Sequence, residues 1–349
     1  MFKQFLHQPP PDLARRCVLK TTLALLAATG LAPLRAETAT LRVNIPGPLL
    51  MPFFPIELIP KLAFDRQAGV DLGIRYLPTG VLALEDMLAG NADFAGVGFP
   101  VLPKFLGKGH PVVAIGRLSS GAPPYAIIVR ADLADKIRSI EDLRGRTLGA
   151  PVGSATTKTY LQLVAELWVS AYDVSPKEIR WAPITQTYAG VYGAMAGETV
   201  DAVFCEEPYS ASLVREGLGV TLASLNDPRN PVGVVGKDHL RAVIVTTPDR
   251  IAANPERVIS MAKMLRQSLR WANAATPRQI VDQLQISDAN QRHDLIDALQ
   301  RLPAQYSPDG GFSEAEIEAT REFMRAVGLS MPGDADIRTL IDDRWVQPG

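Results

Sequence analysis

The chain has 349 residues, of which 47% are hydrophobic and 21% are charged. This is the composition of a globular protein of about two domains, and it excludes disorder, collagen-like repeats and coiled coil as the main state. The 36 Lys and Arg nearly balance the 37 Asp and Glu, which argues against a nucleic-acid-binding protein, and two cysteines exclude a disulfide framework.

Residues 1–36 have the features of a secretory signal peptide. Arg15 and Arg16 precede an apolar stretch over 21–34, and Ala36 is a small residue at the expected cleavage point. The stretch is too short to cross a bilayer as a helix, which needs about 20 residues. The arginine pair followed by Cys-Val-Leu-Lys resembles the twin-arginine export motif, with a general secretory signal as the alternative. We therefore expect a periplasmic mature protein.

Removal of this segment changes the charge and the cysteine count. The segment carries five basic residues and one aspartate, a net +4, so its loss lowers the net charge from −1 to −5. Cys205 is then the only cysteine of the mature chain. A chain without an internal disulfide is compatible with folding in the reducing cytoplasm before export.

The first part of the mature sequence alternates strands with helices. The turns Pro46-Gly47-Pro48 and Pro78-Thr79-Gly80 end the first two strands. Strands separated by helices of this length indicate parallel pairing and an α/β fold. Strands are expected over 41–45, 72–77, 92–98 and 112–117, and helices over 56–65 and 82–89.

The second part repeats the alternation and then becomes helical beyond Pro255. Strands are expected over 125–129, 147–150, 178–182, 200–205, 219–223 and 242–246. Helices are expected over 156–171, 188–196, 255–275, 277–285, 293–302 and 313–327.

Two blocks of this pattern, 42–118 and 147–223, lie in tandem. Within them, Leu88–Ala95 corresponds loosely to Met195–Ala202, and each segment places an aspartate at the start of a short buried strand. The correspondence indicates two strand–helix blocks of similar topology, with independent origin of similar turns as the alternative.

Four stretches resemble a known family. They are Ile140–Gly149 (IEDLRGRTLG), Gly153-Ser154 before a predicted helix, Ala194–Ala202 (AMAGETVDA) and Glu207-Pro208. In this order they resemble the periplasmic solute-binding proteins of ABC importers, in the group that binds nitrate, sulfonates, taurine and thiamine-type pyrimidines. The likeness covers most of residues 41–345.

This resemblance implies a two-lobed type 2 periplasmic binding protein fold of the α/β class. Lobe one would contain residues 37–125 and, after the chain returns, residues 247–349 with the C-terminal helices. Lobe two would contain residues 126–246. Two hinge strands, Tyr125–Arg130 and Ala242–Thr246, would cross between the lobes.

A ligand is expected beyond the carboxyl ends of the strands, as in other open α/β sheets. Gly153 and Ser154 lie between a predicted strand and the helix predicted over 156–171, and Thr156 and Thr157 lie at the start of that helix. Free backbone N–H groups and the helix dipole favour an anion at such a position. The alternative is that Ser154 or Thr156 only caps the helix.

Other strand ends supply further candidates. For Phe99 the alternative is core packing. Glu207 either contacts the ligand or makes a structural contact at the hinge, whereas the tyrosines offer rings and hydroxyl groups. Aromatic residues near the cleft, among them Phe53, favour an organic ligand. The strand-end candidates are Thr79 and Phe99 in lobe one, and Tyr188, Glu207 and Tyr209 in lobe two, where Gln186 also follows a strand.

The sequence carries no motif for catalysis. The four histidines have no metal-binding spacing, and phosphate-binding loops, dinucleotide-binding glycines and serine-hydrolase motifs are missing. We predict a protein that is not an enzyme and holds no metal or cofactor.

The family resemblance implies the substrate-binding component of an ABC transporter. It would capture a small organic or anionic solute, of the sulfonate, nitrate, taurine or pyrimidine type, and deliver it to an inner-membrane permease. We expect a monomer with no nucleic-acid partner. The alternative function is a ligand-sensing periplasmic subunit that presents its closed form to a membrane sensor.

Overall fold

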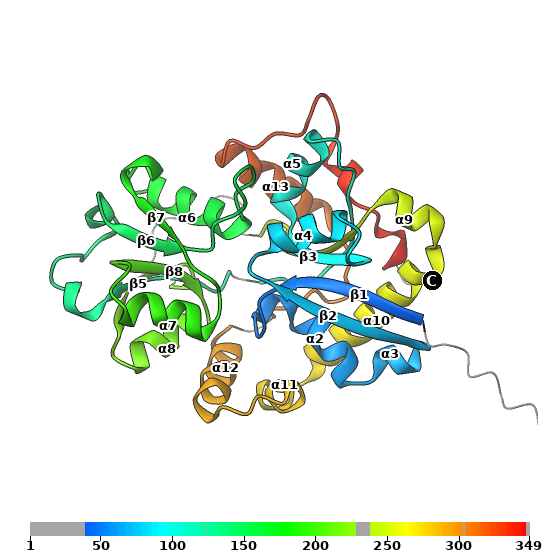
Figure 1. Ribbon diagram of the computed structural model, residues 1–349, viewed down its shortest axis with the longest axis horizontal. Helices are drawn as coiled ribbons and strands as arrows, with labels where there is room; N and C mark the ends of the chain where they lie inside the picture. Colours follow the sequence, from blue (N-terminus) through cyan, green and yellow to red (C-terminus); the bar gives the residue numbers. More distant parts are fainter. Residues whose placement is uncertain (1–38, 122, 228–237, 303, 347–349) are drawn as a thin grey trace, which may run out of the picture. The chain divides into compact units, whose positions relative to one another are not determined.

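The computed structural model describes residues 39–121, 123–227, 238–302 and 304–346. The signal peptide predicted over 1–36 lies outside the described residues. Within these ranges, ten strands form two five-stranded sheets with helices on both faces (Figure 1). The predicted α/β class and the division into two sheets are confirmed.

The first sheet, which with its helices we call lobe one, has the strand order β2-β1-β3-β10-β4. β1 is parallel to β2 and β3, whereas β10 is antiparallel to both of its neighbours. The carboxyl ends of the parallel strands therefore share one edge with the start of β10. The strands are β1 (Ala39–Pro46), β2 (Val70–Leu77), β3 (Phe94–Gly98), β4 (Val113–Arg117) and β10 (Ala242–Thr246).

The second sheet, which with its helices we call lobe two, has the order β7-β6-β8-β5-β9. β6 is parallel to β7 and β8, and β5 is antiparallel to β8 and β9. The strands are β5 (Tyr125–Arg130), β6 (Thr147–Ala150), β7 (Arg180–Pro183), β8 (Ala202–Glu206) and β9 (Gly219–Ser224).

The chain passes from lobe one to lobe two between β4 and β5, and returns between β9 and β10. We call 118–124 and 225–241 the first and second crossing segments. The two strands predicted to cross, 125–130 and 242–246, each lie in one sheet and directly follow a crossing segment. In both sheets this incoming strand takes the fourth position, so the two predicted blocks share one topology.

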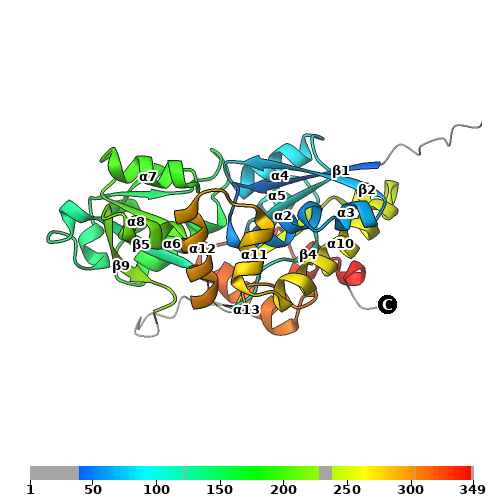
Figure 2. The same ribbon diagram turned by 90° about the horizontal axis from the view of Figure 1, so that it is seen from below.

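Helices cover both faces of each sheet (Figures 1 and 2). In lobe two, α6 lies on one face and α7 and α8 lie on the other. The α-helices are α2 (Phe54–Lys61), α3 (Phe64–Gln67), α4 (Gly80–Leu88), α5 (Leu102–Gly107), α6 (Tyr160–Ser170), α7 (Tyr188–Ala196), α8 (Tyr209–Arg215), α9 (Pro248–Ala253), α10 (Pro255–Ala274), α11 (Pro277–Leu284), α12 (Ala289–Arg301) and α13 (Glu314–Ala326). Short 3-10 helices are η1 (Met51–Phe53), η2 (Phe99–Val101), η3 (Ala131–Leu133), η4 (Ile140–Leu143), η5 (Pro176–Glu178), η6 (Ile337–Leu340) and η7 (Asp343–Trp345).

Three predicted helices differ from the observed ones. The helix predicted over 293–302 begins earlier, at Ala289, because Asp288 acts as its N-cap. The helix predicted over 56–65 is broken into α2 and α3, because Ala63 adopts a left-handed conformation with φ 58°. The helix predicted over 156–171 begins only at Tyr160, because the Thr159 hydroxyl accepts a hydrogen bond from the backbone of Gln162 and acts as its N-cap. Helices α5, α8 and α9 were not predicted.

The hydrophobic core forms two layers, one on each side of the sheets. β5 illustrates the division, because Ala126 and Ile128 belong to one layer and Tyr125, Ile127 and Val129 to the other, as the alternation of side chains along a strand requires. Each layer contains buried residues from both lobes. The two lobes therefore share apolar contacts on both sides of the crossing segments.

Candidate functional site

A cavity lies between the lobes, at the edge where the parallel strands of both sheets end. Its empty volume is about 630 Å³, part of it open to solvent. Lobe one lines it with residues after β1, β2 and β3 and before β10: Pro46, Leu50, Pro52, Phe53, Pro78, Thr79, Gly80, Val81, Val97, Gly98, Val101, Arg241 and Ala242. Lobe two contributes Tyr125, Pro151, Thr159, Tyr160, Leu161, Gln186 and Glu206. This is the position at which open α/β sheets bind ligands.

Most of the cavity wall is apolar. A proline stands at the end of three strands that lead to the cavity, and each of these strands ends at the cavity edge. The prolines are Pro46 in β1, Pro78 after β2 and Pro151 after β6. Leu50 and Phe53 then bring buried side chains to the wall from the segment after β1, and Leu161 brings a partly buried one from the first turn of α6. Such a wall favours a ligand with an apolar body.

Three polar side chains of the wall are buried, and each has at least one polar atom without a hydrogen-bond partner among the described residues. Gln186, Glu206 and Arg241 are 3%, 2% and 4% exposed. Both terminal atoms of Gln186, Oε1 of Glu206 and Nη1 of Arg241 have no hydrogen-bond partner among the described residues. An unsatisfied buried polar group costs about 1–3 kcal/mol. A ligand that supplies the missing partners would remove this cost.

Arg241 connects the two crossing segments. It ends the second crossing segment, immediately before β10, and its Nη2 donates a hydrogen bond to the carbonyl oxygen of Ser120 in the first. Its own carbonyl oxygen accepts a hydrogen bond from Phe99 at 2.7 Å, which fixes its backbone to the end of β3. The guanidinium group is therefore held where the two lobes join.

Glu206 is the last residue of β8, and its carboxyl is close enough to Arg241 for the two charges to interact. Burial raises the pKa of the Glu206 carboxyl to about 8, and the positive charge of Arg241 opposes this shift. Loss of hydration is thus the larger effect on Glu206. At neutral pH the protonated, uncharged form of this carboxyl predominates.

A chain of aromatic side chains continues from the cavity into lobe one. Tyr125 and Tyr160 line the cavity with ring centroids 6.2 Å apart, and the Tyr160 hydroxyl lies 3.0 Å from Nε2 of His239. The His239 ring stacks on Phe323 of α13 at 4.1 Å. Burial and the nearby Arg241 lower the pKa of His239 to about 3, so this histidine is neutral and serves to position Tyr160.

Of the nine predicted site residues, Thr79 is the one that lines the cavity. Its hydroxyl also accepts a hydrogen bond from the backbone of Leu82 at 3.2 Å and caps α4. Phe99 follows β3 but is fully buried in the core layer that contains Tyr160. Its side chain does not line the cavity, which agrees with the core-packing alternative.

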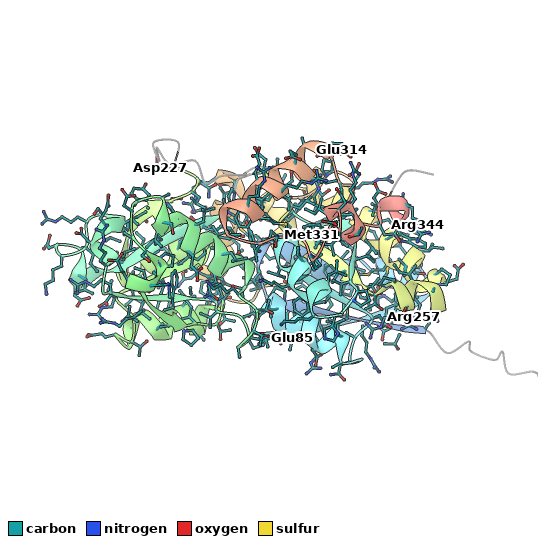
Figure 3. The ribbon with its side chains drawn as sticks, turned by 90° about the horizontal axis from the view of Figure 1, so that it is seen from above. Glu85, Asp227, Arg257, Glu314, Met331 and Arg344 are labelled. Atoms are coloured by element: carbon teal, nitrogen blue, oxygen red, sulfur yellow. The ribbon has the colours of Figure 1, made fainter. Side chains whose placement is uncertain are left out.

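The predicted turn Gly153–Thr157 contacts lobe one instead of lining the cavity. Ser154 Oγ donates a hydrogen bond to Glu85 Oε1 of α4 at 2.9 Å. Figure 3 shows Glu85 where the cyan part of lobe one meets the green lobe two. Nζ of Lys108 donates to the hydroxyls of Thr156 at 2.6 Å and Thr157 at 2.7 Å. These bonds join the two lobes directly.

Gly153 has a steric role in the same turn. A Cβ atom at this position would lie 1.7 Å from the carbonyl oxygen of Thr157, so only glycine fits. Because α6 begins at Tyr160, the free N–H groups expected after Gly153 belong instead to residues 160 and 161, which do line the cavity. The predicted helix start was four residues too early.

Tyr188, Glu207 and Tyr209 lie together on lobe two outside the cavity. The Tyr188 and Tyr209 rings pack edge to face at 5.0 Å, and the Tyr209 hydroxyl lies 3.3 Å from the carbonyl oxygen of Pro48 in lobe one. Glu207 Oε2 lies 3.5 Å from the Arg301 guanidinium of α12. Tyr209 and Glu207 thus contact segments that come from lobe one or from the C-terminal helices.

Four of the polar wall residues missing from the predicted site residues are Tyr125, Tyr160, Glu206 and Arg241, and most of their positions follow from the predicted strands. Tyr125 starts a predicted strand, Arg241 precedes one and Glu206 follows one. A charged residue at the end of a strongly apolar strand was the available signal. Tyr160 had no such signal, because the predicted helix placed it in the second turn.

Two kinds of feature are missing from the described ranges. No group of three or more His, Cys, Asp or Glu side chains there is arranged to hold a metal ion. In the same ranges, no helix has the length and apolar character needed to cross a membrane.

Comparisons with known proteins agree with this architecture. A family model described as NMT1/THI5 like matches residues 61–280, more than half of the chain. No curated protein matches the sequence significantly.

Solved structures of the same fold are numerous. The alkanesulfonate-binding protein SsuA from Xanthomonas axonopodis pv. citri, bound to MOPS, is 17% identical, with a TM-score of 0.69 over 88% of this chain and 99% of that chain. A Candida albicans gene product with the generic periplasmic binding protein fold is 12% identical, with a TM-score of 0.68 over 89% and 98%. The nitrate-binding protein NrtA from Synechocystis PCC 6803 is 14% identical, with a TM-score of 0.59 over 75% and 70%. At these identities the likeness shows the fold, and it confirms the periplasmic binding protein architecture.

Proposed function

This chain belongs to the NMT1/THI5-like family, and we propose that it is the periplasmic solute-binding component of an ABC importer. It captures a small organic or anionic solute between its two lobes and delivers it to a permease in the inner membrane. The observation that carries the proposal is the cavity between the lobes, in which Gln186, Glu206 and Arg241 have buried polar atoms without partners among the described residues.

The contacts between the lobes support capture by closure. The Ser154–Glu85 hydrogen bond and the Lys108 contacts with Thr156 and Thr157 all join residues of different lobes. These bonds form only when the lobes meet, and a solute that contacts both cavity walls adds to them. Such a solute binds the closed form more tightly than an open form and shifts the population toward closure.

The predicted site residues take three roles in this proposal: contact with the solute, stabilisation of the closed form, and support of both from outside the cavity. Thr79 contacts the solute directly, together with the cavity residues described above. Ser154, Thr156, Thr157 and Tyr209 stabilise the closed form, and Gly153 allows their turn to fold. Phe99, Tyr188 and Glu207 support these elements from outside the cavity. No step of capture and release requires a bond to be made or broken in the solute.

The named relatives support the solute class and the location. Two of the structural neighbours are named as an alkanesulfonate-binding protein and a periplasmic nitrate-binding protein. We propose export through the signal peptide over 1–36 and cleavage to a monomer. The lobes predicted as 37–125 with 247–349 and as 126–246 are proposed with one change, which places all of β5 in lobe two and β10 in lobe one.

Extraction of the solute tests this function. The protein is purified from the periplasm, denatured, and the released small molecules are identified by mass spectrometry. We expect one compound in a 1:1 ratio that rebinds unchanged and whose uptake into cells depends on this protein. Conversion of the compound by the protein would show an enzyme, and unchanged uptake in its absence would contradict a role in import.

A further inference from the structure

Resting on the proposed function, we infer that the solute is an organic acid with a single negative charge and a mostly apolar body, and that its carboxylate or sulfonate group pairs with Arg241 at the hinge. The sequence pointed to the helix start after Gly153 for an anion, whereas the structure places the charge-selecting group on the second crossing segment.

The charges of the cavity wall favour an anion. Arg241 is its one basic residue and Glu206 its one acidic residue among the described residues. The guanidinium remains protonated at all physiological pH values, and its partner through Nη2 is the uncharged carbonyl group of Ser120. Because burial keeps the Glu206 carboxyl largely protonated at neutral pH, with a pKa of about 8, the wall carries an excess positive charge.

An unpaired buried charge is expensive, and a ligand anion compensates it. Nη1 of Arg241 is buried without a partner among the described residues, and the amide of Gln186 provides a second such donor. Carboxylate and sulfonate groups have several acceptor oxygens on one atom, so they match the planar donors of arginine. A cationic ligand would increase the uncompensated charge.

The remaining wall determines the body of the solute. Leu50, Phe53, Val97, Val101 and Leu161 surround the polar groups with apolar surface. A small inorganic anion would leave these walls without contacts, whereas a ring or short hydrocarbon body would gain about 25 cal/mol per Å² of buried apolar area. An aromatic or alicyclic acid satisfies both parts of the cavity.

The turn that the sequence favoured for the anion has other partners. Ser154 is bonded to Glu85, and Thr156 and Thr157 are bonded to Lys108. Their hydroxyl groups contribute to closure and leave recognition of charge to Arg241. Because Arg241 also joins the two crossing segments, the anion binds at the residue that couples the lobes.

Matched ligands test the inference directly. Calorimetric titration of the purified protein at pH 7 compares benzoate, phenylacetate, cyclohexanecarboxylate and benzenesulfonate with the primary amides of the same skeletons and with benzylamine. We expect the acids to bind about 10- to 100-fold more tightly than their amides, the range for a hydrogen bond to a charged group. Arg241→Gln should reduce this preference to within about twofold, a residual difference too small for a charged contact.

Two further variants separate charge from folding. Arg241→Lys keeps the positive charge and should retain part of the preference, even if Arg241→Gln proves unstable. Arg138→Gln removes a surface arginine whose side chain is 73% exposed, and should leave the preference unchanged.

The outcomes distinguish the inference from the proposed function. Equal binding of acids and amides, preferential binding of benzylamine, or an acid preference that survives both Arg241 variants would overturn the inference while leaving solute capture intact. Failure of every compound in the three series to bind at millimolar concentration would overturn both the inference and capture of such solutes in this cavity.

Discussion

Gly98 of lobe one and Tyr160 of lobe two are so close that a Cβ atom on Gly98 would lie 2.4 Å from Cβ of Tyr160. Both residues line the cavity, and Gly98 has an ordinary extended conformation with φ −73° that alanine also adopts. The absence of a side chain at Gly98 therefore serves the approach of the lobes and not the backbone conformation.

Gly98→Ala should weaken solute binding. The added methyl group meets the rigid Cβ of Tyr160, and overpacking of this kind costs about 1–3 kcal/mol in the closed form, or roughly 5- to 150-fold in affinity. Gly193→Ala is the matched control, because a Cβ atom there meets nothing within 4 Å. Calorimetry with the extracted solute measures both variants, and equal affinity of Gly98→Ala and the parent would contradict a binding mode that requires this contact.

The Ser154–Glu85 hydrogen bond should contribute to closure independently of the charge of the ligand. Ser154→Ala and Glu85→Ala should each reduce solute affinity, by about 0.5–1.5 kcal/mol, and their effects should not be additive because each removes the same bond. A double-mutant cycle on affinity measures the coupling. Additive effects, or a loss confined to acidic ligands, would instead place Ser154 in direct contact with the anion.

The Glu206 carboxyl should make the folded protein less stable as the pH rises. Its pKa is about 8 in the folded protein, against 4.5 for a fully hydrated glutamate, so between these values the folded state binds a proton that the unfolded state has released. The free energy of unfolding then falls with pH, by about 1.4 kcal/mol per unit at most. Glu206→Gln should flatten this slope up to pH 8.

Glu57 provides the comparison for that measurement. Burial raises its pKa to about 7, so Glu57→Gln should flatten the slope only below pH 7. Arg241 is the charged group that opposes the pKa shift of Glu206. The charge of Glu206 in turn acts on four neighbouring titratable groups, those of Tyr125, Tyr160, Tyr209 and Cys205. Urea unfolding at several pH values measures the slopes, and an unchanged slope in Glu206→Gln between pH 7 and 8 would show that this carboxyl is ionised.

Asp294 should anchor α12 to lobe two. Its carboxylate accepts hydrogen bonds from Arg215 Nε at 2.9 Å and Nη2 at 2.7 Å, and from the hydroxyl of Ser212. Asp294→Asn should reduce the free energy of unfolding by about 1–2 kcal/mol, a value lowered for the partial exposure of Arg215. Asp297→Asn, three residues further along α12 in an exposed pair with His293, should change it by less than about 0.5 kcal/mol. Equal effects would show that the buried contacts of Asp294 contribute nothing specific.

The twin-arginine motif is tested by export. Arg15→Lys combined with Arg16→Lys should leave the precursor in the cytoplasm, because this route depends on the arginine pair. Cell fractionation with detection of the precursor and mature forms measures the outcome. Normal export of the double variant would indicate a general secretory signal.

The strands were accessible from the sequence because apolar runs and the turns that end them are local signals, whereas the assignment of lobes came from the family resemblance. The turns predicted at Pro46 and Pro78 correctly placed the ends of β1 and β2, which line the cavity. The start of α6 was not accessible, because Thr156, Thr157 and Thr159 are all possible caps and the choice depends on Lys108 and Glu85, which come from another lobe.

The binding residues themselves were less predictable than the strands. Glu206 and Glu207 are adjacent in sequence, yet Glu206 lines the cavity and Glu207 lies beside Arg301. Side chains alternate between the two faces at a strand end, so the register of β8 decides which carboxyl enters the cavity. The predicted strand ended one residue early, at 205, and the resemblance of Glu207-Pro208 to the family drew attention to Glu207 instead of Glu206.

Helix α12 has a consequence for the motion of the lobes. α11 packs on α2 of lobe one, whereas α12 packs on α8 of lobe two, as Figure 2 shows for the yellow and orange helices. The lobes are thus connected by two covalent crossings, by the contacts of Ser154, Thr156 and Thr157 with lobe one, and by a helix held by Asp294. Unlike the contacts of these three hydroxyl groups, α12 is also linked through the chain to α11, which packs on lobe one. Movement of lobe two would therefore be passed through α12 to α11 and α2, so that opening involves the C-terminal helices as well as the two sheets.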